Sequence, residues 1–378
     1  MQYRPFGNIN WQVSALGFGC MRFPTRDGES GAIQEAEAAN MLHYAIDHGV
    51  NYLDTAYPYH DGQSEPFLGR TLRGKYRDKV KLATKLPCWK VEGRDDFDRL
   101  LNEQLDRLQT DQVDFYLLHA LNEKSWQKML SLDVLSWLEK ARNDGRISYL
   151  GFSFHDQYPV FKEIVDAYQD WDFCQIQYNI MDVDYQAGKK GLRYAADLGL
   201  AVVIMEPIRG GSLVDPPSSV QKLWKKAPVR RSPPAWALHW LWDQPEVSLV
   251  LSGMSALNHV KENVAAAAQS RVNFLNEEEK KLIQEVREAY LSLSLIPCTG
   301  CKYCLPCPNG LNIPRILEIY NDTIMYDKLE SGINQYHNLI PEDKRADRCE
   351  QCGECEENCP QEIVISEWMK TIHEELAR

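Results

Sequence analysis

A chain of 378 residues is long enough for one large domain and a smaller appendage. Hydrophobic residues make up 44% and charged residues 25%, as in ordinary soluble globular proteins. The net charge of −12 argues against nucleic acid or an anionic membrane as the partner, because both attract positive surfaces. The apolar run Leu198–Met205 is too short to cross a bilayer, and the start Met1–Pro5 lacks the apolar stretch of a signal peptide. We therefore expect a cytoplasmic protein.

Short apolar runs alternate with amphipathic stretches eight times from residue 15 onward. The predicted strands are Ala15–Cys20, Asn51–Ala56, Val80–Lys85, Val113–His119, Ile147–Ser153, Cys174–Asn179, Ala201–Pro207 and Val247–Gly253. Their length and apolar character are typical of parallel strands that are buried on both faces. Eight strand–helix units over about 250 residues predict a (β/α)8 TIM barrel.

A doubly wound open sheet is the alternative architecture. Such a sheet would carry a G-x-G-x-x-G turn after an early strand. The segment Leu16–Met21 has two of these glycines and lacks the third, so the barrel is favoured. Before the first strand, the turn residues Phe6–Asn8 predict a small hairpin within residues 1–14 that plugs the barrel floor.

Helices are predicted between the strands. In Asp95–Gln109, apolar residues recur at three- and four-residue spacing, which indicates one buried stripe. Gly145 follows the predicted helix Asp133–Asn143, and Gly49 follows the helix before the second strand. Both glycines are predicted helix C-caps.

Eight of the eleven cysteines lie after residue 297, in two runs. The first run is Cys298-x2-Cys301-x2-Cys304-x2-Cys307-Pro308, and the second is Cys349-x2-Cys352-x2-Cys355-x3-Cys359-Pro360. The second run has the spacing of bacterial ferredoxins, in which the fourth cysteine ligates the other cluster. The sequence therefore predicts two [4Fe–4S] clusters and an electron-transfer module. One cluster would be held by Cys298, Cys301, Cys304 and Cys359, and the other by Cys349, Cys352, Cys355 and Cys307.

Zinc ligands and disulfides are the two alternative interpretations of these cysteines. Zinc sites also use C-x2-C pairs, but they need four ligands that usually come as two separated pairs. Disulfides are disfavoured in a reducing cytoplasm. The first run has x2 rather than x3 before Cys307, which leaves open whether Cys307 is a ligand and whether the second cluster is complete.

The cysteine module follows a charged amphipathic helix predicted over Asn276–Leu291. The segment Ile313–Leu339 between the two runs also reads as helical. We therefore predict a barrel domain over residues 1–290 and a small, mostly helical ferredoxin-like domain over residues 291–378.

Polar side chains follow three consecutive predicted strands, at the end of a barrel where catalytic residues lie. Asp54 and Tyr59 come from the end of the second strand, Lys85 ends the third and His119 ends the fourth. In this order they resemble the catalytic tetrad of the aldo-keto reductase family. The resemblance covers roughly residues 1–290, and the cysteine module resembles the extension of a subset of that family. The resemblance of the barrel to this family also includes the segments Gly151–Ser153, Gln175–Asn179, Glu206–Gly211, Ser252–Ser255 and His259–Asn263.

The four residues suit carbonyl reduction, which needs a hydride on carbon and a proton on oxygen. Tyr59 is the predicted general acid, and a nearby Lys85 ammonium would favour its phenolate and ease proton donation. Asp54 would neutralise and orient Lys85. A neutral His119 would hydrogen-bond the carbonyl oxygen.

The resemblance also implies an extended nicotinamide dinucleotide across the barrel mouth. Ser153 and Gln177 match the pair that binds the carboxamide of the nicotinamide, and the loop Pro207–Leu213 would cover the pyrophosphate. The implied cofactor-binding residues are Cys20, Met21, Asp54, Ser153, Gln177, Pro207, Ile208, Gly210, Gly211, Leu213, Gly253, Ser255, His259, Glu262 and Asn263. Members that prefer NADPH carry a lysine and an arginine where Gly253 and His259 stand here, so NAD and NADP both stay open.

The leading hypothesis is an oxidoreductase that reduces aldehydes or ketones, or oxidises alcohols, with NAD(P)H. Nicotinamide transfers two electrons as hydride, whereas each cluster accepts one. A second hypothesis is therefore a ferredoxin-linked enzyme in which a flavin splits the pair, although no residue indicates a flavin. A third is a non-catalytic redox-sensing subunit, against which the intact tetrad counts. The expected partners are a small carbonyl or alcohol and a ferredoxin or other electron-transfer protein, without nucleic acid or membrane.

Overall fold

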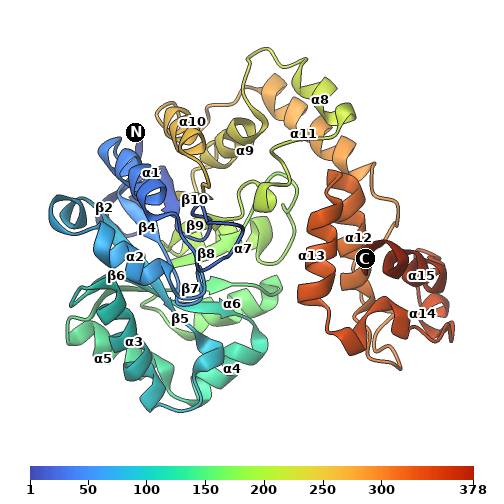
Figure 1. Ribbon diagram of the computed structural model, residues 1–378, viewed down its shortest axis with the longest axis horizontal. Helices are drawn as coiled ribbons and strands as arrows, with labels where there is room; N and C mark the ends of the chain where they lie inside the picture. The colour runs from blue at the N-terminus through green and yellow to red at the C-terminus, as the bar shows by residue number, and fades with distance from the viewer. The chain divides into compact units, whose positions relative to one another are not determined.

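The computed structural model describes residues 1–378 and divides into two compact units (Figure 1). The first comprises Met1–Gly210 and Pro234–Asn276, and the second comprises Gly211–Pro233 and Glu277–Arg378. The segment Gly211–Pro233 thus belongs to the second unit, although it precedes the last barrel strand in sequence. The domain division at residue 290 stays a prediction.

Eight parallel strands close into a barrel in the first unit. They are β3 (Leu16–Gly19), β4 (Tyr52–Asp54), β5 (Lys81–Leu86), β6 (Val113–Leu121), β7 (Ile147–Phe154), β8 (Phe173–Gln177), β9 (Ala201–Met205) and β10 (Leu249–Gly253). The last strand pairs with the first, which closes the barrel, and each strand overlaps its predicted segment. The predicted TIM barrel is confirmed.

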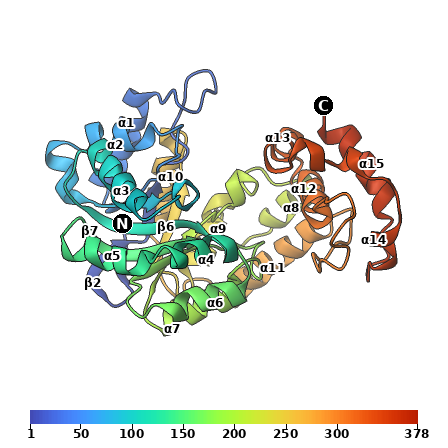
Figure 2. The ribbon, with the colours of Figure 1, turned by 90° about the horizontal axis from the view of Figure 1, so that it is seen from below.

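Helices surround the barrel strands, as Figures 1 and 2 show. They are α1 (Glu35–Asp47), α2 (Ser64–Thr71), α3 (Asp95–Leu108), α4 (Glu123–Ser131), α5 (Val134–Asn143), α6 (Tyr158–Ala167), α7 (Gly188–Asp197), α9 (Pro233–Trp242) and α10 (Leu257–Ala267). The predicted apolar stripe of α3 is buried. Gly49 and Gly145 have φ of 96° and 86° after α1 and α5, the left-handed conformation that favours glycine at a C-cap.

The N-terminal segment forms the expected hairpin, with β1 (Tyr3–Phe6) antiparallel to β2 (Ile9–Ser14). Phe6 is fully buried, and its ring lies 5.1 Å from that of Phe115 and 5.9 Å from those of Tyr52 and Phe173. Tyr52 and Phe173 are the first residues of their strands. The hairpin therefore closes the N-terminal end of the barrel and leaves the C-terminal end for a functional site.

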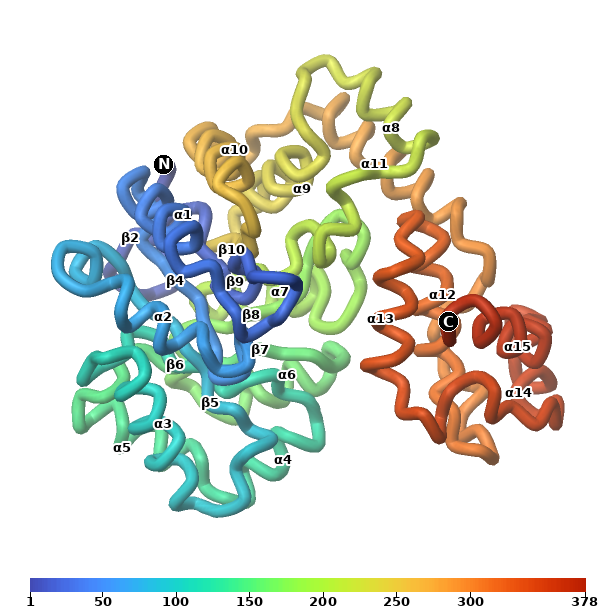
Figure 3. The backbone as a smooth tube through the Cα atoms, in the orientation of Figure 1, coloured from blue at the N-terminus to red at the C-terminus, as the bar shows by residue number.

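The second unit is helical (Figure 3). It has an apolar core of its own. Its helices are α8 (Ser218–Trp224), α11 (Glu277–Leu291), α12 (Ile313–Tyr326), α13 (Leu329–Leu339), α14 (Glu354–Glu357) and α15 (Ile365–Leu376). The predicted helical segment 313–339 is divided in two, because Asp327 adopts φ of 52° and ends α12. Helix α12 packs against both α13 and α15. None of the helices is long and apolar enough to cross a lipid bilayer.

Candidate active site and cluster pockets

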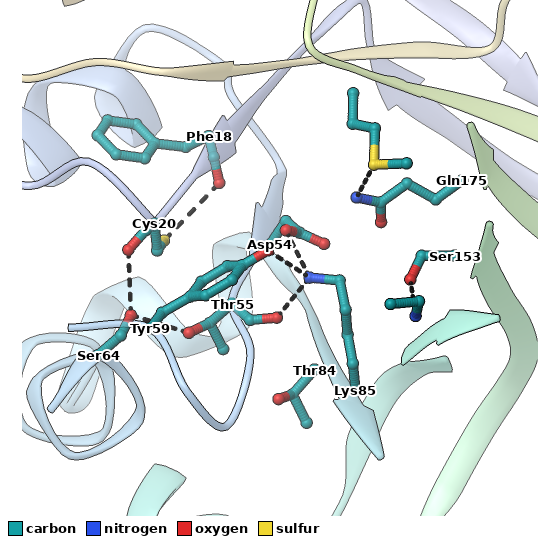
Figure 4. A network of polar contacts seen from close by, with 12 residues as sticks. Phe18, Cys20, Asp54, Thr55, Tyr59, Ser64, Thr84, Lys85, Ser153 and Gln175 are labelled. Atoms are coloured by element: carbon teal, nitrogen blue, oxygen red, sulfur yellow. Dashed lines mark hydrogen bonds and ion pairs between the residues drawn. The ribbon is translucent and has the colours of Figure 1, made fainter. Parts of the chain in front are cut away.

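Three of the four predicted catalytic side chains meet at the C-terminal ends of β4 and β5 (Figure 4). Lys85 Nζ donates to Asp54 Oδ1 at 2.8 Å and to the Tyr59 hydroxyl at 3.3 Å. It also donates to the carbonyl oxygen of Thr55 at 2.7 Å. This backbone acceptor could not be predicted from the sequence, because no side-chain type indicates it. Lys85 and Asp54 are 1% and 2% exposed, so the ion pair is held out of water.

Burial and ion pairing set the charge state of this group. Burial alone lowers the pKa of Lys85, but Asp54 and Tyr59 beside its ammonium outweigh burial and raise that pKa. Burial raises the pKa of Tyr59 above its ordinary value, and the opposing effect of Lys85 is smaller. Lys85 lowers the pKa of Tyr59, as expected from the sequence, but burial raises that pKa by more, so the net pKa is raised. Tyr59 is therefore protonated at neutral pH, the state that a proton donor requires.

His119 lies on β6, and its ring centroid is 6.2 Å from that of Tyr59 and 5.1 Å from that of Trp89. Burial lowers the pKa of His119 well below its ordinary value, and the charge of Lys85 lowers it further. Its ring nitrogen Nδ1 is buried without a hydrogen-bond partner. The imidazole is thus neutral, and its Nδ1 has no partner within the chain.

A bulge in β6 follows His119. The pairing with β7 shifts register after Leu118, and Ala120 has φ of 55°. The Ala120 N–H donates to Ser153 Oγ at 2.7 Å. Ser153 therefore holds the backbone that carries His119, in addition to its predicted role at the cofactor.

The sequence also did not indicate a buried polar network that contacts the backbone of Lys85. Glu65 Oε1 accepts from Thr84 Oγ1 at 2.6 Å and from Gln104 Nε2 at 2.7 Å. Gln104 Nε2 also donates to the Lys85 carbonyl oxygen at 3.0 Å. Burial raises the pKa of Glu65. The signal that was available is Gln104 itself, a fully buried polar residue within the apolar stripe of α3.

The predicted cofactor residues follow several strand ends of one barrel. Cys20 and Met21 come after β3, Ser153 and Gln177 lie on β7 and β8, Pro207, Ile208 and Gly210 follow β9, Gly253 ends β10, and Ser255, His259, Glu262 and Asn263 lie in or before α10. Gly211 and Leu213 fall in the second compact unit. Asp54 Oδ2 is buried without a partner, which fits an acceptor for a ribose hydroxyl of a dinucleotide. The cofactor roles of all these residues stay predictions.

Arg22, which lies outside the motifs quoted above, is beside Gly210 after β9 and Gly253 at the end of β10. A Cβ atom on Gly253 would lie 3.0 Å from Arg22 Cδ, and one on Gly210 would lie 3.4 Å from its NH2 nitrogen. TIM barrels often bind phosphate at these loops. Arg22 therefore provides a cation beside Gly253, a position that carries no charge itself.

The eight C-terminal cysteines line two pockets. Cys298, Cys301, Cys304 and Cys359 line one, while Cys307, Cys349, Cys352 and Cys355, together with Cys304, line the other. The division matches the exchange of fourth ligands that the spacing predicts, and it includes Cys307. No three side chains of cysteine, histidine, aspartate or glutamate lie close enough together to hold a single metal ion. Four thiols around a pocket form a donor set suited to the larger [4Fe–4S] core.

The barrel and the cysteine module each match a known protein family. Residues 15–288 match the Aldo/keto reductase family. Residues 297–364 match the 4Fe-4S dicluster domain.

Similar proteins cover most of the barrel. An uncharacterized oxidoreductase of Bacillus subtilis, YqkF, is 25% identical over 315 residues, which span 75% of this chain and 96% of that protein. The NADH-specific methylglyoxal reductase of Escherichia coli is 24% identical over 337 residues, or 76% of this chain and 99% of that protein. The L-galactose dehydrogenase of Arabidopsis thaliana is 24% identical over 322 residues, or 78% and 97%.

Solved structures of aldo-keto reductases have a similar fold. The holo form of an aldo-keto reductase from Bacillus halodurans is similar with a TM-score of 0.63 and 27% identity, covering 76% of this chain and 96% of that one. The family match spans more than half of the chain. The chain therefore belongs to the aldo/keto reductase family of oxidoreductases, and its dicluster domain with eight cysteines implies two [4Fe–4S] clusters.

Proposed function

We propose that this chain reduces small aldehydes or ketones, or oxidises the corresponding alcohols, with NAD(P)H at the C-terminal end of the barrel. Family membership implies the nicotinamide cofactor, which supplies a hydride when bound. The observation that carries the proposal is the position of Lys85 Nζ, 2.8 Å from Asp54 and 3.3 Å from the Tyr59 hydroxyl.

Each of the four residues has one task in this proposal. Tyr59 donates its proton to the carbonyl oxygen of the substrate. Lys85, kept cationic by Asp54, stabilises the phenolate that remains on Tyr59. Neutral His119, whose Nδ1 has no hydrogen-bond partner within the chain, donates an N–H to the same oxygen and stabilises the charge that develops there.

The chain offers matching groups to the cofactor. Ser153 and Gln177 face the carboxamide in this proposal, and Asp54 Oδ2 accepts from a ribose hydroxyl. Arg22 supports the phosphates beside Gly253. A single arginine suits a pyrophosphate as well as a 2′-phosphate, so NADH and NADPH are both to be tested.

The names of two relatives suggest the first substrates. One is a methylglyoxal reductase and another is an L-galactose dehydrogenase. We propose small 2-oxoaldehydes and sugars as the first compounds to assay with this chain.

Replacement of the proposed acid tests the assignment. Tyr59→Phe removes the transferable proton and should lower kcat for carbonyl reduction by roughly 10²–10⁴-fold, with little change in the Kd for NAD(P)H. Tyr57→Phe is the matched control, because the Tyr57 hydroxyl bonds Glu103 at 3.1 Å and has no task in the mechanism. Unchanged turnover in Tyr59→Phe would remove Tyr59 from its role.

The dicluster domain favours one second candidate, in which a ferredoxin or other one-electron donor supplies the clusters and a flavin pairs the electrons. The exposed cysteines Cys301 and Cys352 of the two pockets support access for such a donor. A double variant, Cys301→Ala with Cys352→Ala, separates the candidates. Full activity with NAD(P)H alone in this variant argues for the barrel mechanism, and complete loss in a folded variant argues for the second candidate.

A further inference from the structure

His60 directly follows the proposed proton donor and lies buried in an unusual turn. It is 6% exposed. His60, Asp61 and Gly62 have φ of 53°, 51° and 83°, so three consecutive residues adopt the left-handed conformation. Histidine and aspartate take this conformation rarely, and they keep it only where surrounding contacts hold them. The contacts of the His60 side chain therefore bear on how this turn is held.

The segment 22–34 between β3 and α1, the strap, folds back on itself. Thr25 and Ile33 pair as an isolated antiparallel bridge. The backbone N–H of Gln34 donates to the Pro24 carbonyl oxygen at 2.8 Å, and its side-chain Nε2 donates to the Thr25 carbonyl oxygen, also at 2.8 Å. The strap is therefore a small hairpin whose two legs are joined at the base.

The His60 ring binds both legs of the strap. The backbone N–H of Phe23 donates to His60 Nε2 at 3.1 Å, and His60 Nδ1 lies 2.8 Å from the Ser30 carbonyl oxygen. A backbone N–H can only donate, and a carbonyl oxygen can only accept. Nε2 is therefore the acceptor, Nδ1 carries the proton, and the ring is neutral in this one tautomer.

Apolar packing and a second hydrogen bond join the same two parts of the chain. The ring of Phe23 is 3% exposed, and its centroid lies 5.7 Å from that of His60 and 5.0 Å from that of Phe67. Ser64 Oγ donates to the Cys20 carbonyl oxygen at 3.2 Å (Figure 4). The loop after β4 is thus bonded to the strap and to the residues just before it.

Arg22 stands at the start of the strap, and its side chain lies beside Gly210 and Gly253. An arginine side chain is long and has many rotamers, so it serves a fixed ligand best where its backbone is held. The N–H that His60 accepts belongs to the peptide unit that joins Arg22 to Phe23. His60 therefore fixes the backbone at the point from which the Arg22 side chain extends.

We infer that His60 is a positioning residue: its neutral ring holds the strap against the turn after Tyr59 and thereby keeps Arg22 beside the phosphates of the dinucleotide. The inference rests on the proposed function, because it assumes that a dinucleotide binds at the barrel mouth with its phosphates near Arg22. It predicts an effect on cofactor binding rather than on the chemical step, because Lys85 contacts Tyr59 without the strap.

Removal of the ring tests the inference, and glycine is the substitution that isolates it. Glycine adopts φ of 53° without strain, so His60→Gly deletes the two hydrogen bonds and permits the turn. We propose to measure the Kd of NADH and NADPH by titration calorimetry on the full chain, isolated anaerobically, and kcat at saturating cofactor. The Kd should rise roughly three- to thirtyfold, as for the loss of one or two neutral hydrogen bonds, while kcat changes by less than about threefold.

A double-mutant cycle tests whether His60 acts through Arg22. Arg22→Ala should itself raise the Kd by roughly 10- to 100-fold, the range for a charge-assisted hydrogen bond. In this background His60→Gly should change the Kd by less than about twofold, because the side chain that it displaces is already absent. His60→Asn should recover part of the affinity, because asparagine tolerates the left-handed conformation and can donate to the Ser30 carbonyl oxygen.

Trypsin provides a measurement that needs no cofactor. Arg26 is an exposed residue of the strap. Cleavage after Arg26 is fastest when the strap opens locally, so His60→Gly should accelerate it by at least roughly fivefold. His43→Ala is the matched control, because His43 Nε2 also bonds one backbone carbonyl oxygen, that of Thr71 at 3.1 Å, but no residue of the strap. This control should change neither the cleavage rate nor the Kd.

An unchanged Kd in His60→Gly would overturn the inference, even if trypsin cleaved the strap faster. A loss of kcat at unchanged Kd would also overturn it, because the ring would then act on Tyr59. Equal losses of affinity with and without Arg22 would show that His60 does not act through Arg22. If His60→Gly does not fold, His60→Asn still decides, because asparagine is too short to replace Nε2 as the acceptor for Phe23; wild-type affinity in His60→Asn would then contradict the inference.

Failure of the inference and failure of the proposed function give different results. A wild-type chain that binds neither dinucleotide would overturn the proposed function together with the role of Arg22. A wild-type chain that binds a dinucleotide as tightly as His60→Gly does would overturn the inference alone.

Discussion

Lys85 is a cation in a place that water does not reach. Taking such a charge out of water is costly unless a fixed counter-charge and hydrogen bonds replace the water. Asp54, the Thr55 carbonyl and the Tyr59 hydroxyl provide three acceptors within 3.3 Å of its nitrogen. The same low polarity keeps the Tyr59 proton in place until a negative charge develops on a substrate oxygen. Burial therefore selects the charge states that proton donation needs.

The pKa shifts predict the pH profile of carbonyl reduction. Burial lowers the pKa of His119 well below 6.5, so this residue is neutral throughout the neutral range. Burial raises the pKa of Tyr59 above 10.0, and reduction requires its protonated form. We expect kcat/KM to be flat between about pH 6.5 and 9 and to fall only as the pH rises through the raised pKa of Tyr59. An inflection near pH 6.5 that disappears in His119→Asn would contradict the shift assigned to His119.

Backbone geometry limits what the sequence could reveal about the site residues. Asp54, Tyr59, Lys85 and His119 could be selected because they lie near or just after the ends of three consecutive strands. The Thr55 carbonyl that accepts from Lys85 could not, because no side-chain type signals a backbone acceptor.

The two ends of the barrel have different tasks: one end is packed for stability, and the other carries the polar groups of the site. The hairpin β1–β2 closes one end with aromatic packing, and the strand ends and the loops after them carry the polar groups at the other. Strand existence and order were predictable, because strands buried on both faces are apolar over their whole length. The division of segment 313–339 was not, because an aspartate rather than a glycine takes the left-handed conformation at residue 327.

Removing the side chain of Phe6 should destabilise the barrel without affecting the site. Phe6→Ala leaves a cavity among the rings of Tyr52, Phe115 and Phe173, and we expect a loss of roughly 3–5 kcal/mol in the free energy of unfolding. The Kd for NAD(P)H should stay within about twofold. Tyr3→Ala, at a residue 48% exposed in the same hairpin, should cost clearly less. Equal losses from the two substitutions in urea unfolding would show that Phe6 does not plug the barrel.

At the scale of the whole molecule, the chain consists of two compact units, and their family matches imply two different kinds of electron chemistry. The barrel belongs to a family that handles hydride, and the dicluster domain implies centres that handle single electrons. Cysteine spacing was enough to predict two groups of four thiols, and these groups line two pockets. Their roles as cluster ligands stay predictions. The partner and the route of the electrons depend on surfaces that spacing does not describe.

Metal analysis checks the two cluster pockets. We expect about eight iron and eight acid-labile sulfide per chain after anaerobic isolation. Cys359→Ser removes one ligand of the pocket lined by Cys298, Cys301 and Cys304, and should lower both values toward about four. About four in the wild type would mean a single cluster. Loss of iron from both pockets in the variant would mean that the pockets do not load independently.

Tracing the hydride tests the proposed reaction most directly. The chain would be incubated anaerobically with NADH or NADPH carrying deuterium at both C4 positions and with a small 2-oxoaldehyde, and the product would be analysed by mass spectrometry. Direct transfer at the barrel mouth predicts one deuterium on the carbon that was the carbonyl, in the wild type and in the Cys301→Ala, Cys352→Ala variant. A product that forms at the same rate with hydrogen from water at that carbon would contradict direct transfer, because electrons passing through a flavin or the clusters lose the label to solvent.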